Sequence, residues 1–262
     1  MTDIAYEKRE FVALATFNRP EVLNAFRPST SDDFFDVLDE VRNDEDVRVL
    51  VITGEGRAFC SGEDLTELEG RLDDQVALAG NREELDRYSE LTRQIVGLPK
   101  TTIAAVNGYA LGLGAEIAIA CDLRLGSEET RFGFVEAKRA LFETNGVTYF
   151  LPRLVGYGRA MDLLLTGEMI NGKEAHRIGL VTRLSAPDQL IDETIALAQM
   201  IAANAPISVR LVKQVLRQTF DRDLDGMMDL EISALQECFL SEDLKEGTMA
   251  FREKREPKYR GR

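Results

Sequence analysis

Glu116 is the lone glutamate in a stretch of otherwise small and apolar residues. The stretch reads NGYALGLGAEIAIACD, residues 107–122, and two closely spaced glycines, Gly112 and Gly114, precede the glutamate. A buried carboxylate is costly unless hydrogen bonds or a reaction make use of it. The glycines predict a turn into a helix that begins near Gly114. Glu116 is therefore a candidate for acid–base chemistry, with a favourable charge in the first turn of a helix as the alternative interpretation.

Other common catalytic motifs are incomplete in this sequence. The single histidine, His176, cannot form a multi-histidine metal cluster, and its surroundings, NGKEAHRIGL, predict the end of a helix. The segment GEMINGKE, residues 167–174, resembles a phosphate-binding loop but has Glu174 where Ser or Thr would hold magnesium. GLGAEI and GEGRAF do not complete the dinucleotide-binding pattern. No metal site is predicted.

Composition restricts the class of protein further. A chain of 262 residues is long enough for one large domain, or for a domain with a smaller appendage. The net charge of -14 argues against a nucleic-acid or anionic-membrane partner. No apolar run approaches the ~20 residues of a membrane span, and the first ten residues lack a signal-peptide core, so we expect a cytoplasmic protein. The cysteines show no C-x-x-C spacing and are predicted to be small, buried, reduced thiols: Cys60, Cys121 and Cys238.

Strand-like and helix-like segments alternate through the first two hundred residues, which predicts an α/β fold. Strands are predicted at 11–18, 47–53, 101–106, 122–127, 130–134 and 179–184. Helices are predicted at 31–43 and from about 114, and a solvent-facing helical lid at 66–96. From Pro187 onward the pattern is helical only. We therefore divide the chain into a core, 1–200, and a helical region for subunit packing, 201–262.

Three segments in a fixed order connect the chain to a known family. They are RAFCSGEDL at 57–65, the glycine-rich stretch above, and TRFGFVEAKRALF at 130–142. In these segments the chain resembles the crotonase, or enoyl-CoA hydratase/isomerase, superfamily, and the likeness runs from NRPEVLNAF to EGTMAFREKREPKYRGR. The resemblance implies a spiral of ββα units with a C-terminal helical trimerisation region. It also implies acyl-CoA substrates and a homotrimer or a hexamer made of two trimers.

The resemblance also implies residue roles. It places two backbone N–H groups, of Glu63 and Leu113, where they hold the oxygen of a thioester enolate. It makes Glu116 and Glu136 the pair of carboxyl groups that flank a water molecule. One can take a proton from the water while the other supplies a proton to carbon, and repulsion with desolvation raises one of the two pKa values. The alternative interpretation of Glu136 is a solvated residue at a helix start.

Coenzyme A enters as part of the substrate, so the resemblance implies no separate cofactor. A large anionic ligand on so acidic a chain needs local cations. In related proteins an aromatic residue and a lysine of the C-terminal segment often come from a neighbouring subunit, and a basic solvated tail is the alternative here. The residues implied for substrate and CoA binding are Arg27, Ser61, Leu65, Gly112, Phe251 and Lys254.

The loop after Glu136 differs from the pattern of many hydratases. They carry a glycine-rich run with proline, whereas this chain reads AKRALFETNGVTYFLPRL. Thr144 and Asn145 stand where small residues are expected, and Glu143 adds another acid. Hydration of an α,β-unsaturated acyl-CoA is the leading prediction. The alternatives are an enoyl-CoA isomerase, an acyl-CoA thioester hydrolase and a non-catalytic CoA-binding oligomer.

Overall fold

Two mixed β-sheets form the framework of the chain. The computed structural model describes residues 2–69, 73–80 and 82–262, and over these residues it contains sheets of six and four strands. The larger sheet has the order β1 (Ile4–Arg9), β2 (Val12–Phe17), β3 (Val49–Gly54), β5 (Thr101–Val106), β7 (Leu123–Ser127), β10 (Arg183–Ser185). The smaller sheet has the order β4 (Ala58–Cys60), β6 (Tyr109–Leu111), β8 (Arg131–Gly133), β9 (Ile170–Asn171). The β1–β2 and β8–β9 pairs are antiparallel, and the other neighbours are parallel.

Both faces of the larger sheet are covered, which explains its uninterrupted apolar strands. Successive side chains of a strand point to opposite faces. In β3, Leu50 and Ile52 join one core cluster, whereas Val49 and Val51 join another on the opposite face. A strand buried on both sides reads as a continuous apolar run, and every residue of β3 is buried.

The helices cover these sheets and continue beyond them. The short 3-10 helices are η1 (Pro20–Val22), η2 (Glu136–Arg139) and η3 (Pro187–Gln189). The helices before the C-terminal region are α1 (Pro28–Asn43), α2 (Leu65–Glu69), α3 (Gln75–Gly80), α4 (Arg82–Gly97), α5 (Leu113–Ala120), α6 (Val147–Val155), α7 (Tyr157–Thr166), α8 (Gly172–Arg177) and α9 (Leu190–Ala202). The last three are α10 (Pro206–Leu216), α11 (Leu224–Leu240) and α12 (Glu242–Glu253).

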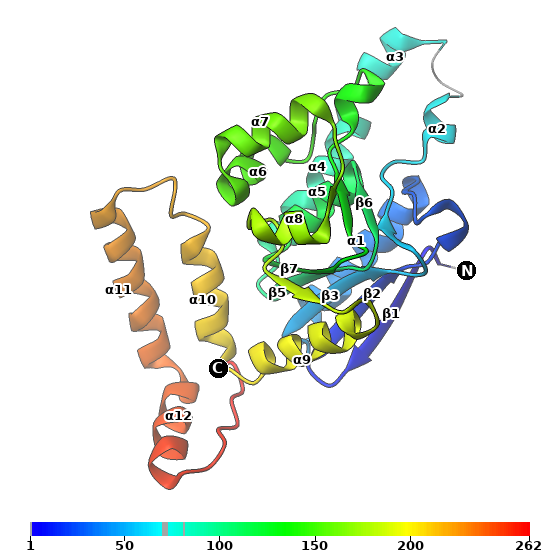
Figure 1. Ribbon diagram of the computed structural model, residues 1–262. Coiled ribbons are helices and arrows are strands. Elements are labelled where there is room, and N and C mark those ends of the chain that lie inside the picture. Colours follow the sequence, from blue (N-terminus) through cyan, green and yellow to red (C-terminus); the bar gives the residue numbers. More distant parts are fainter. Residues whose placement is uncertain (1, 70–72, 81) are drawn as a thin grey trace.

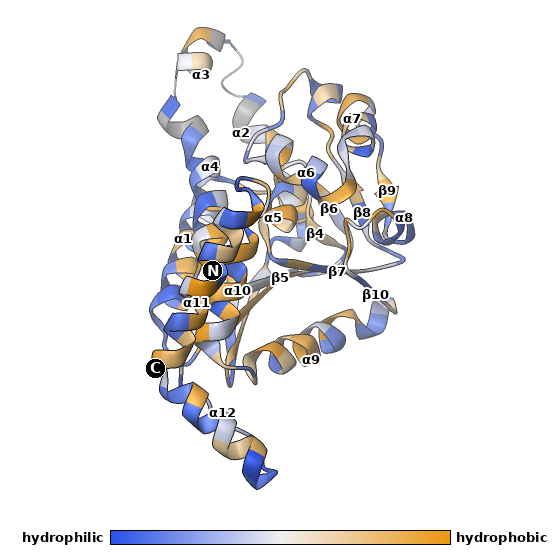
Figure 2. Cartoon of the chain, turned by 90° about the vertical axis from the view of Figure 1, so that its left-hand side faces the viewer, coloured by the Kyte–Doolittle hydropathy of each residue, from blue (hydrophilic) through white to orange (hydrophobic). Residues whose placement is uncertain are grey.

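The chain changes character after α9. That helix covers one face of the larger sheet, whereas α11 and α12 extend away from both sheets (Figure 1). In Figure 2, which looks from the side that carries these helices, α11 overlaps the body of the molecule and α12 extends below it. No single helix of the described residues is long and apolar enough to cross a membrane; the segments Pro187–Ala202 and Pro206–Leu216 meet the length and composition criterion only together, with a bend of 105° between them. The predicted boundary near residue 200 falls beside this break, and the subunit-packing function of 201–262 stays a prediction.

Several local predictions need correction. The strand β1 was not predicted, because its exposed side chains make it polar on one side. The strand predicted at 179–184 begins only at Arg183, since Leu180 and Val181 are buried in the loop after α8. Cys60 and Cys121 are buried as predicted, but Cys238 is only partly buried because it lies on a helix outside the core.

The predicted lid at 66–96 is also only partly a surface feature. Residues 70–72 and 81 lie outside the described residues. The second half of α4 is a core element, because Leu91 and Ile95 are fully buried among the helices. The helices α2 and α3 stand at the outer end of this segment (Figure 1).

Candidate active site

The turn between β6 and α5 requires glycine for two separate reasons. Gly112 has φ 49°, in the region that side chains rarely adopt, and its amide donates to the Gly133 carbonyl at 2.9 Å. A Cβ atom on Gly114 would lie 2.1 Å from the Cys60 carbonyl oxygen. The first turn of α5 therefore packs directly against the end of β4, and the turn into a helix is the one that the glycines predicted.

This packing brings the two predicted amide donors into adjacent segments. Gly62 has φ 103°, and a Cβ atom placed on it would lie 3.7 Å from the Leu113 nitrogen. The Gly62 carbonyl accepts from the Phe26 amide at 2.8 Å, and Phe26 forms a parallel bridge with Glu63. Leu113 begins α5, where the first N–H groups of a helix lack partners within it and carry partial positive charge. The role of these amides as enolate donors stays a prediction.

Glu116 lies on α5, a helix whose residues are all buried. Its side chain is 1% exposed. One carboxylate oxygen accepts from the Thr144 amide at 3.1 Å, and the other accepts from Asn145 Nδ2. Burial raises the pKa of Glu116 to about 7, against the lowering effect of the Asn145 hydrogen bond and with a further raising effect from Glu136. This carboxyl group therefore changes its charge near neutral pH.

Glu136 begins η2 and is half-buried, which differs from a solvated residue at a helix start. Its Oε1 atom would lie 2.8 Å from a Cβ atom on Gly112. The absence of a side chain at Gly112 thus makes room for the Glu136 carboxylate. One oxygen from each of Glu116, Glu136 and Glu143 lies within 4.8 Å of the others, and we call these three residues the carboxylate cluster.

Glu143 is the member that the sequence did not assign to the site. It comes from the loop between η2 and α6, the segment that departs from the glycine-rich pattern. Burial raises its pKa to about 8, and Glu136 and Glu116 add to this effect. The extra acid in that loop was the available signal, but only the fold shows that it turns toward Glu136.

The carboxylate cluster consists of oxygen donors of the kind that divalent cations bind. Among the described residues it is the one group of three His, Cys, Asp or Glu side chains close enough to hold a metal ion. Closeness of acidic groups alone does not define a metal site, and the prediction that no metal takes part stays a prediction. His176 lies apart from this group, at the end of α8, where Nδ1 is 3.1 Å from the Val181 carbonyl oxygen.

The residues implied for CoA binding fall into two sets. Ser61, half-buried, and Leu65, at the start of α2, flank the Glu63 segment. Arg27 binds Asp3 through two hydrogen bonds of 2.7 and 2.8 Å, and this pairing lowers the pKa of Asp3 to about 2. Much of the Arg27 charge is therefore already balanced, and its predicted contact with CoA is left untested.

Phe251 and Lys254 form the second set, and they lie far from the cluster within one chain. Phe251 is 88% exposed on α12, and Lys254 is the residue that ends this helix. Because α12 extends away from the sheets (Figure 1), these side chains do not approach α5 of their own chain. A contact with substrate would have to be made in a neighbouring subunit.

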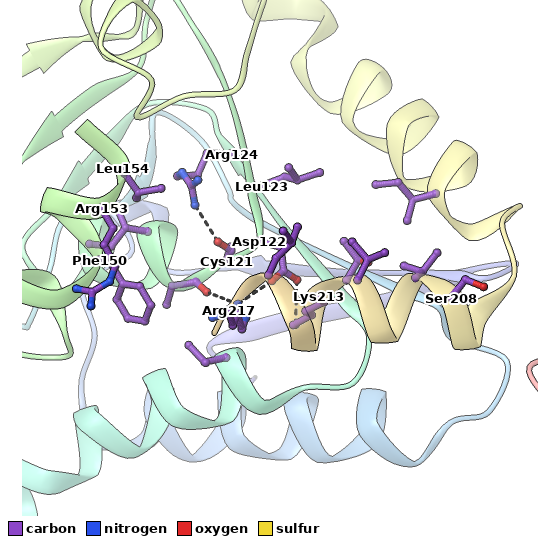
Figure 3. Close-up of a pocket in the computed structure, with 18 of the residues that line it drawn as sticks. Cys121, Asp122, Leu123, Arg124, Phe150, Arg153, Leu154, Ser208, Lys213 and Arg217 are labelled. Carbon is purple, nitrogen blue, oxygen red and sulfur yellow. Dashed lines mark hydrogen bonds and ion pairs between the residues drawn. The ribbon is translucent and has the colours of Figure 1, made fainter. Parts of the chain in front are cut away.

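A cavity lies between α10 and the end of α5 (Figure 3), and no member of the carboxylate cluster lines it. Its volume is about 1120 Å³, and its lining includes Cys121, Phe150 and Arg153. Asp122 accepts from Lys213 at 2.9 Å and from Arg217 at 2.7 Å across this space. These ion pairs hold α10 against the sheet.

Comparison with known proteins places this geometry in a family. The family model described as enoyl-CoA hydratase/isomerase matches residues 7–262. The chain therefore belongs to the enoyl-CoA hydratase/isomerase family, and it is an enzyme of the crotonase superfamily that catalyses a crotonase-type reaction. The predicted family, fold and enzyme class are confirmed.

Individual relatives match over nearly their whole length. The chain is 37% identical to a short-chain-enoyl-CoA hydratase of Clostridium acetobutylicum, over 97% of this chain and 96% of the relative. It is 33% identical to a 1,2-epoxyphenylacetyl-CoA isomerase of Escherichia coli, over 96% and 95%. The crystal structure of an enoyl-CoA hydratase from Bacillus anthracis matches with a TM-score of 0.94 at 34% identity, covering 99% of this chain and 100% of the other.

Proposed function

We propose that the enzyme adds water to an α,β-unsaturated acyl-CoA thioester and forms the 3-hydroxyacyl-CoA. The observation that carries this proposal is the approach of the Glu116 and Glu136 carboxylates at the glycine turn that begins α5. Hydration needs one group that accepts a proton and one that donates a proton within reach of the reacting carbons. Two carboxyl groups beside a pair of backbone amides meet that need.

The proposed reaction proceeds through an enolate. The amides of Glu63 and Leu113 hold the thioester oxygen while water adds to Cβ and the carbon–carbon π bond opens toward Cα. One carboxylate of the pair takes the proton that the water loses, and the other carboxyl group gives a proton to Cα. With a pKa of about 7, Glu116 exists in both protonation states near neutral pH, which suits a group that exchanges protons at each turnover.

Substrate binding in this proposal depends on a second copy of the chain. We propose a homotrimer or a dimer of trimers in which Phe251 and Lys254 contact the CoA of a neighbouring subunit. The support is an apolar stripe along α11, called the α11 stripe, whose members are all exposed in the single chain: Leu224, Met228, Ile232, Leu235 and Phe239. An exposed apolar surface of this kind marks a contact surface.

An enoyl-CoA isomerase is the second candidate, because a relative named as an isomerase matches over 96% of this chain. An isomerase would move a proton between carbons with a carboxyl group and would add no water. The altered loop at 143–147 does not separate the two reactions. Its hydrogen bonds from Thr144 and Asn145 hold Glu116, a carboxyl group that either reaction would use. The product separates the two candidates.

The test is an assay with crotonyl-CoA and a series of longer enoyl-CoA esters. Loss of the enoyl absorbance together with a product heavier by one water supports hydration. A product of unchanged mass with a shifted double bond supports the isomerase, and release of free CoA supports a hydrolase. Binding of the esters by calorimetry with no turnover on the whole series contradicts the proposed activity and favours a CoA-binding oligomer.

We propose that the enzyme uses no cofactor apart from the CoA carried by its substrate. We also propose the cytoplasmic location that the sequence led us to expect. We propose that the enzyme has no nucleic-acid or membrane partner, on the basis of the net charge of -14. Filter binding of RNA at moderate salt tests for a nucleic-acid partner.

A further inference from the structure

Within the carboxylate cluster, Glu136 and Glu143 have buried oxygens without hydrogen-bond donors. Both carboxyl oxygens of Glu143 and Oε2 of Glu136 are buried, and none of them has a hydrogen-bond partner among the described residues. Glu116 differs, because Thr144 and Asn145 both donate to it. Ionised carboxylates only accept hydrogen bonds, so two of them buried side by side without donors are strongly disfavoured.

One proton held between Glu143 and Glu136 supplies the missing hydrogen-bond donor and removes one of the two charges. A protonated Glu143 has one O–H donor, and Glu136 is the adjacent acceptor whose buried oxygen lacks a donor. The charged groups that face Glu143 are Glu136 from η2 and Glu116 from α5, and both are acidic. Two like charges at this separation cannot both be ionised without a large cost, so the proton stays in the pair.

We propose that Glu143 is a positioning residue that stays protonated at neutral pH and donates its proton to the Glu136 carboxylate, which holds that carboxylate over Gly112. This inference builds on the proposed function, because it explains how one of the two catalytic carboxylates is kept in place. It goes beyond that function in assigning a role to the loop where this chain departs from the hydratase pattern. In this proposal Glu143 acts through Glu136.

The expected pH range follows from the direction of the shift. Burial, followed by the effects of Glu136 and Glu116, raises the pKa of Glu143 to about 8. The proton is therefore present at neutral pH and is lost as the pH rises through about 8. Above that point the two carboxylates repel each other, and Glu136 leaves its position beside Gly112.

The first experiment does not depend on enzymatic activity. Infrared difference spectra of wild type minus Glu143→Gln, recorded at about pH 6.5 and about pH 9.5, report the C=O stretch of a protonated carboxyl group. We expect this band at the lower pH and its loss at the higher pH. Glu129→Gln, at an exposed glutamate, is the matched control and should show no such band at either pH. Absence of the band in wild type at the lower pH overturns the proposal.

Stability measurements give a second readout that does not need turnover. A carboxyl group whose pKa is raised in the folded state stabilises fully below its ordinary pKa, and this stability is lost as the pH rises through the folded value. Between the ordinary glutamate pKa of 4.5 and about pH 8, wild type should therefore lose stability more steeply than Glu143→Gln does. Parallel pH profiles of the two unfolding midpoints contradict the proposal.

The kinetic experiment compares two replacements of Glu143. Glu143→Leu removes the donor, and we expect kcat to fall by roughly tenfold or more with little change in KM, because Glu136 is no longer held. Glu143→Gln keeps an N–H donor that cannot ionise, so it should restore kcat to within about threefold of wild type and flatten the alkaline fall in rate. Equal loss of kcat in both variants, with unchanged pH profiles, overturns the positioning role.

The two proposals fail in different ways. If wild type hydrates no enoyl-CoA but the infrared band titrates as expected, the assigned reaction is wrong and the Glu136–Glu143 proton is right. If hydration proceeds and the band is absent, the reaction stands and the positioning role fails.

Discussion

The carboxylate cluster and the C-terminal helices differ in whether their side chains find partners within the single chain. Around α5, the buried Glu116 has its donors within the same chain, from Thr144 and Asn145. Along α11, five apolar side chains spaced as one helical stripe are exposed. Another set of residues along α11 is half-buried, namely Met227, Leu230, Ala234 and Cys238, and Cys238 Sγ lies 3.5 Å from Ser208 Oγ of α10. The exposed stripe is therefore a second apolar face.

The residues near α5 therefore bear on the proposed reaction, whereas those on α11 bear on the proposed subunit contact. The groups that would move protons are brought together within one chain, and Glu116 among them receives its hydrogen bonds from that chain. The α11 stripe is exposed in the single chain, and the proposed trimer would bury it against a second copy. We therefore expect changes near α5 to affect turnover, and changes on α11 to affect the oligomeric state first.

The largest expected effect is at Glu116. Glu116→Gln keeps the size and the hydrogen-bonding shape of the side chain but cannot move a proton, so kcat should fall by ~10²–10⁴-fold. Glu136→Gln should cause a loss of the same order. Steady-state hydration assays check this, with Glu129→Gln as the control of unchanged rate. Wild-type rates in both active-site variants would remove the pair from the mechanism.

Gly112→Ala tests whether the turn itself places Glu136. The new Cβ atom would lie 2.8 Å from Glu136 Oε1, at a backbone φ of 49° that disfavours any side chain. We expect kcat to fall by roughly 100-fold and the free energy of unfolding by about 1–3 kcal/mol. Gly158→Ala is the control, since a Cβ atom there meets nothing within 4 Å. A variant with normal kcat would show that the carboxylate does not depend on this space.

Ile232→Glu tests the other side of the comparison. A charge in the middle of the α11 stripe should weaken subunit association by roughly tenfold to 200-fold, because the carboxylate would be buried without a partner. Analytical ultracentrifugation over a range of concentrations measures this effect. Ser233→Glu adds the same charge beside the stripe and should leave the mass unchanged. An unaltered mass in Ile232→Glu shows that the stripe is not the contact surface.

Asn145→Ala tests the electrostatics of Glu116. The Asn145 hydrogen bond opposes the effect of burial, so its loss should raise the pKa of Glu116 further above about 7. A raised folded pKa means that stability present at low pH is lost as the pH rises through that value. The destabilisation of the variant should therefore be smallest below the ordinary pKa of glutamate and should grow by about 1–3 kcal/mol toward alkaline pH.

The pH dependence distinguishes this effect from backbone strain. Asn145 has φ 51°, and the cost of placing Ala in that conformation is the same at every pH. Thr144→Val is the milder control, because it removes a 3.3 Å hydroxyl contact and keeps the Thr144 amide donor. Chemical denaturation at several pH values measures both variants. A destabilisation that does not change with pH would contradict the assigned hydrogen bond.

Lys254→Ala should have the smallest effect. If Lys254 contacts a CoA phosphate in a neighbouring subunit, its removal should raise KM by roughly threefold to tenfold and leave kcat nearly unchanged. The exposed Lys245 on the same helix provides the control substitution. Equal KM values in the two variants would favour the alternative interpretation, in which Lys254 belongs to a basic solvated tail.

Much of the fold was predictable because the signals are local. The apolar runs of β3 and β5 and the glycines at the start of α5 depend on burial and backbone conformation that neighbouring residues specify. The strand β1 was missed because its exposed residues interrupt the apolar pattern. The buried half of α4 was missed because Leu91 and Ile95 occur in a segment rich in charged residues.

The candidate site, too, was predictable only where its features depend on the local sequence. The residue types around Glu116, the glycine turn and the resemblance carried by three segments are properties of the sequence alone, since they depend on order and spacing along the chain. That Glu143 turns toward Glu136, that Gly112 makes room for a carboxylate, and that Arg27 is paired with Asp3 depend on contacts between distant segments. Such contacts arise only when the whole chain packs, because the distance between two side chains is fixed by the elements that carry them.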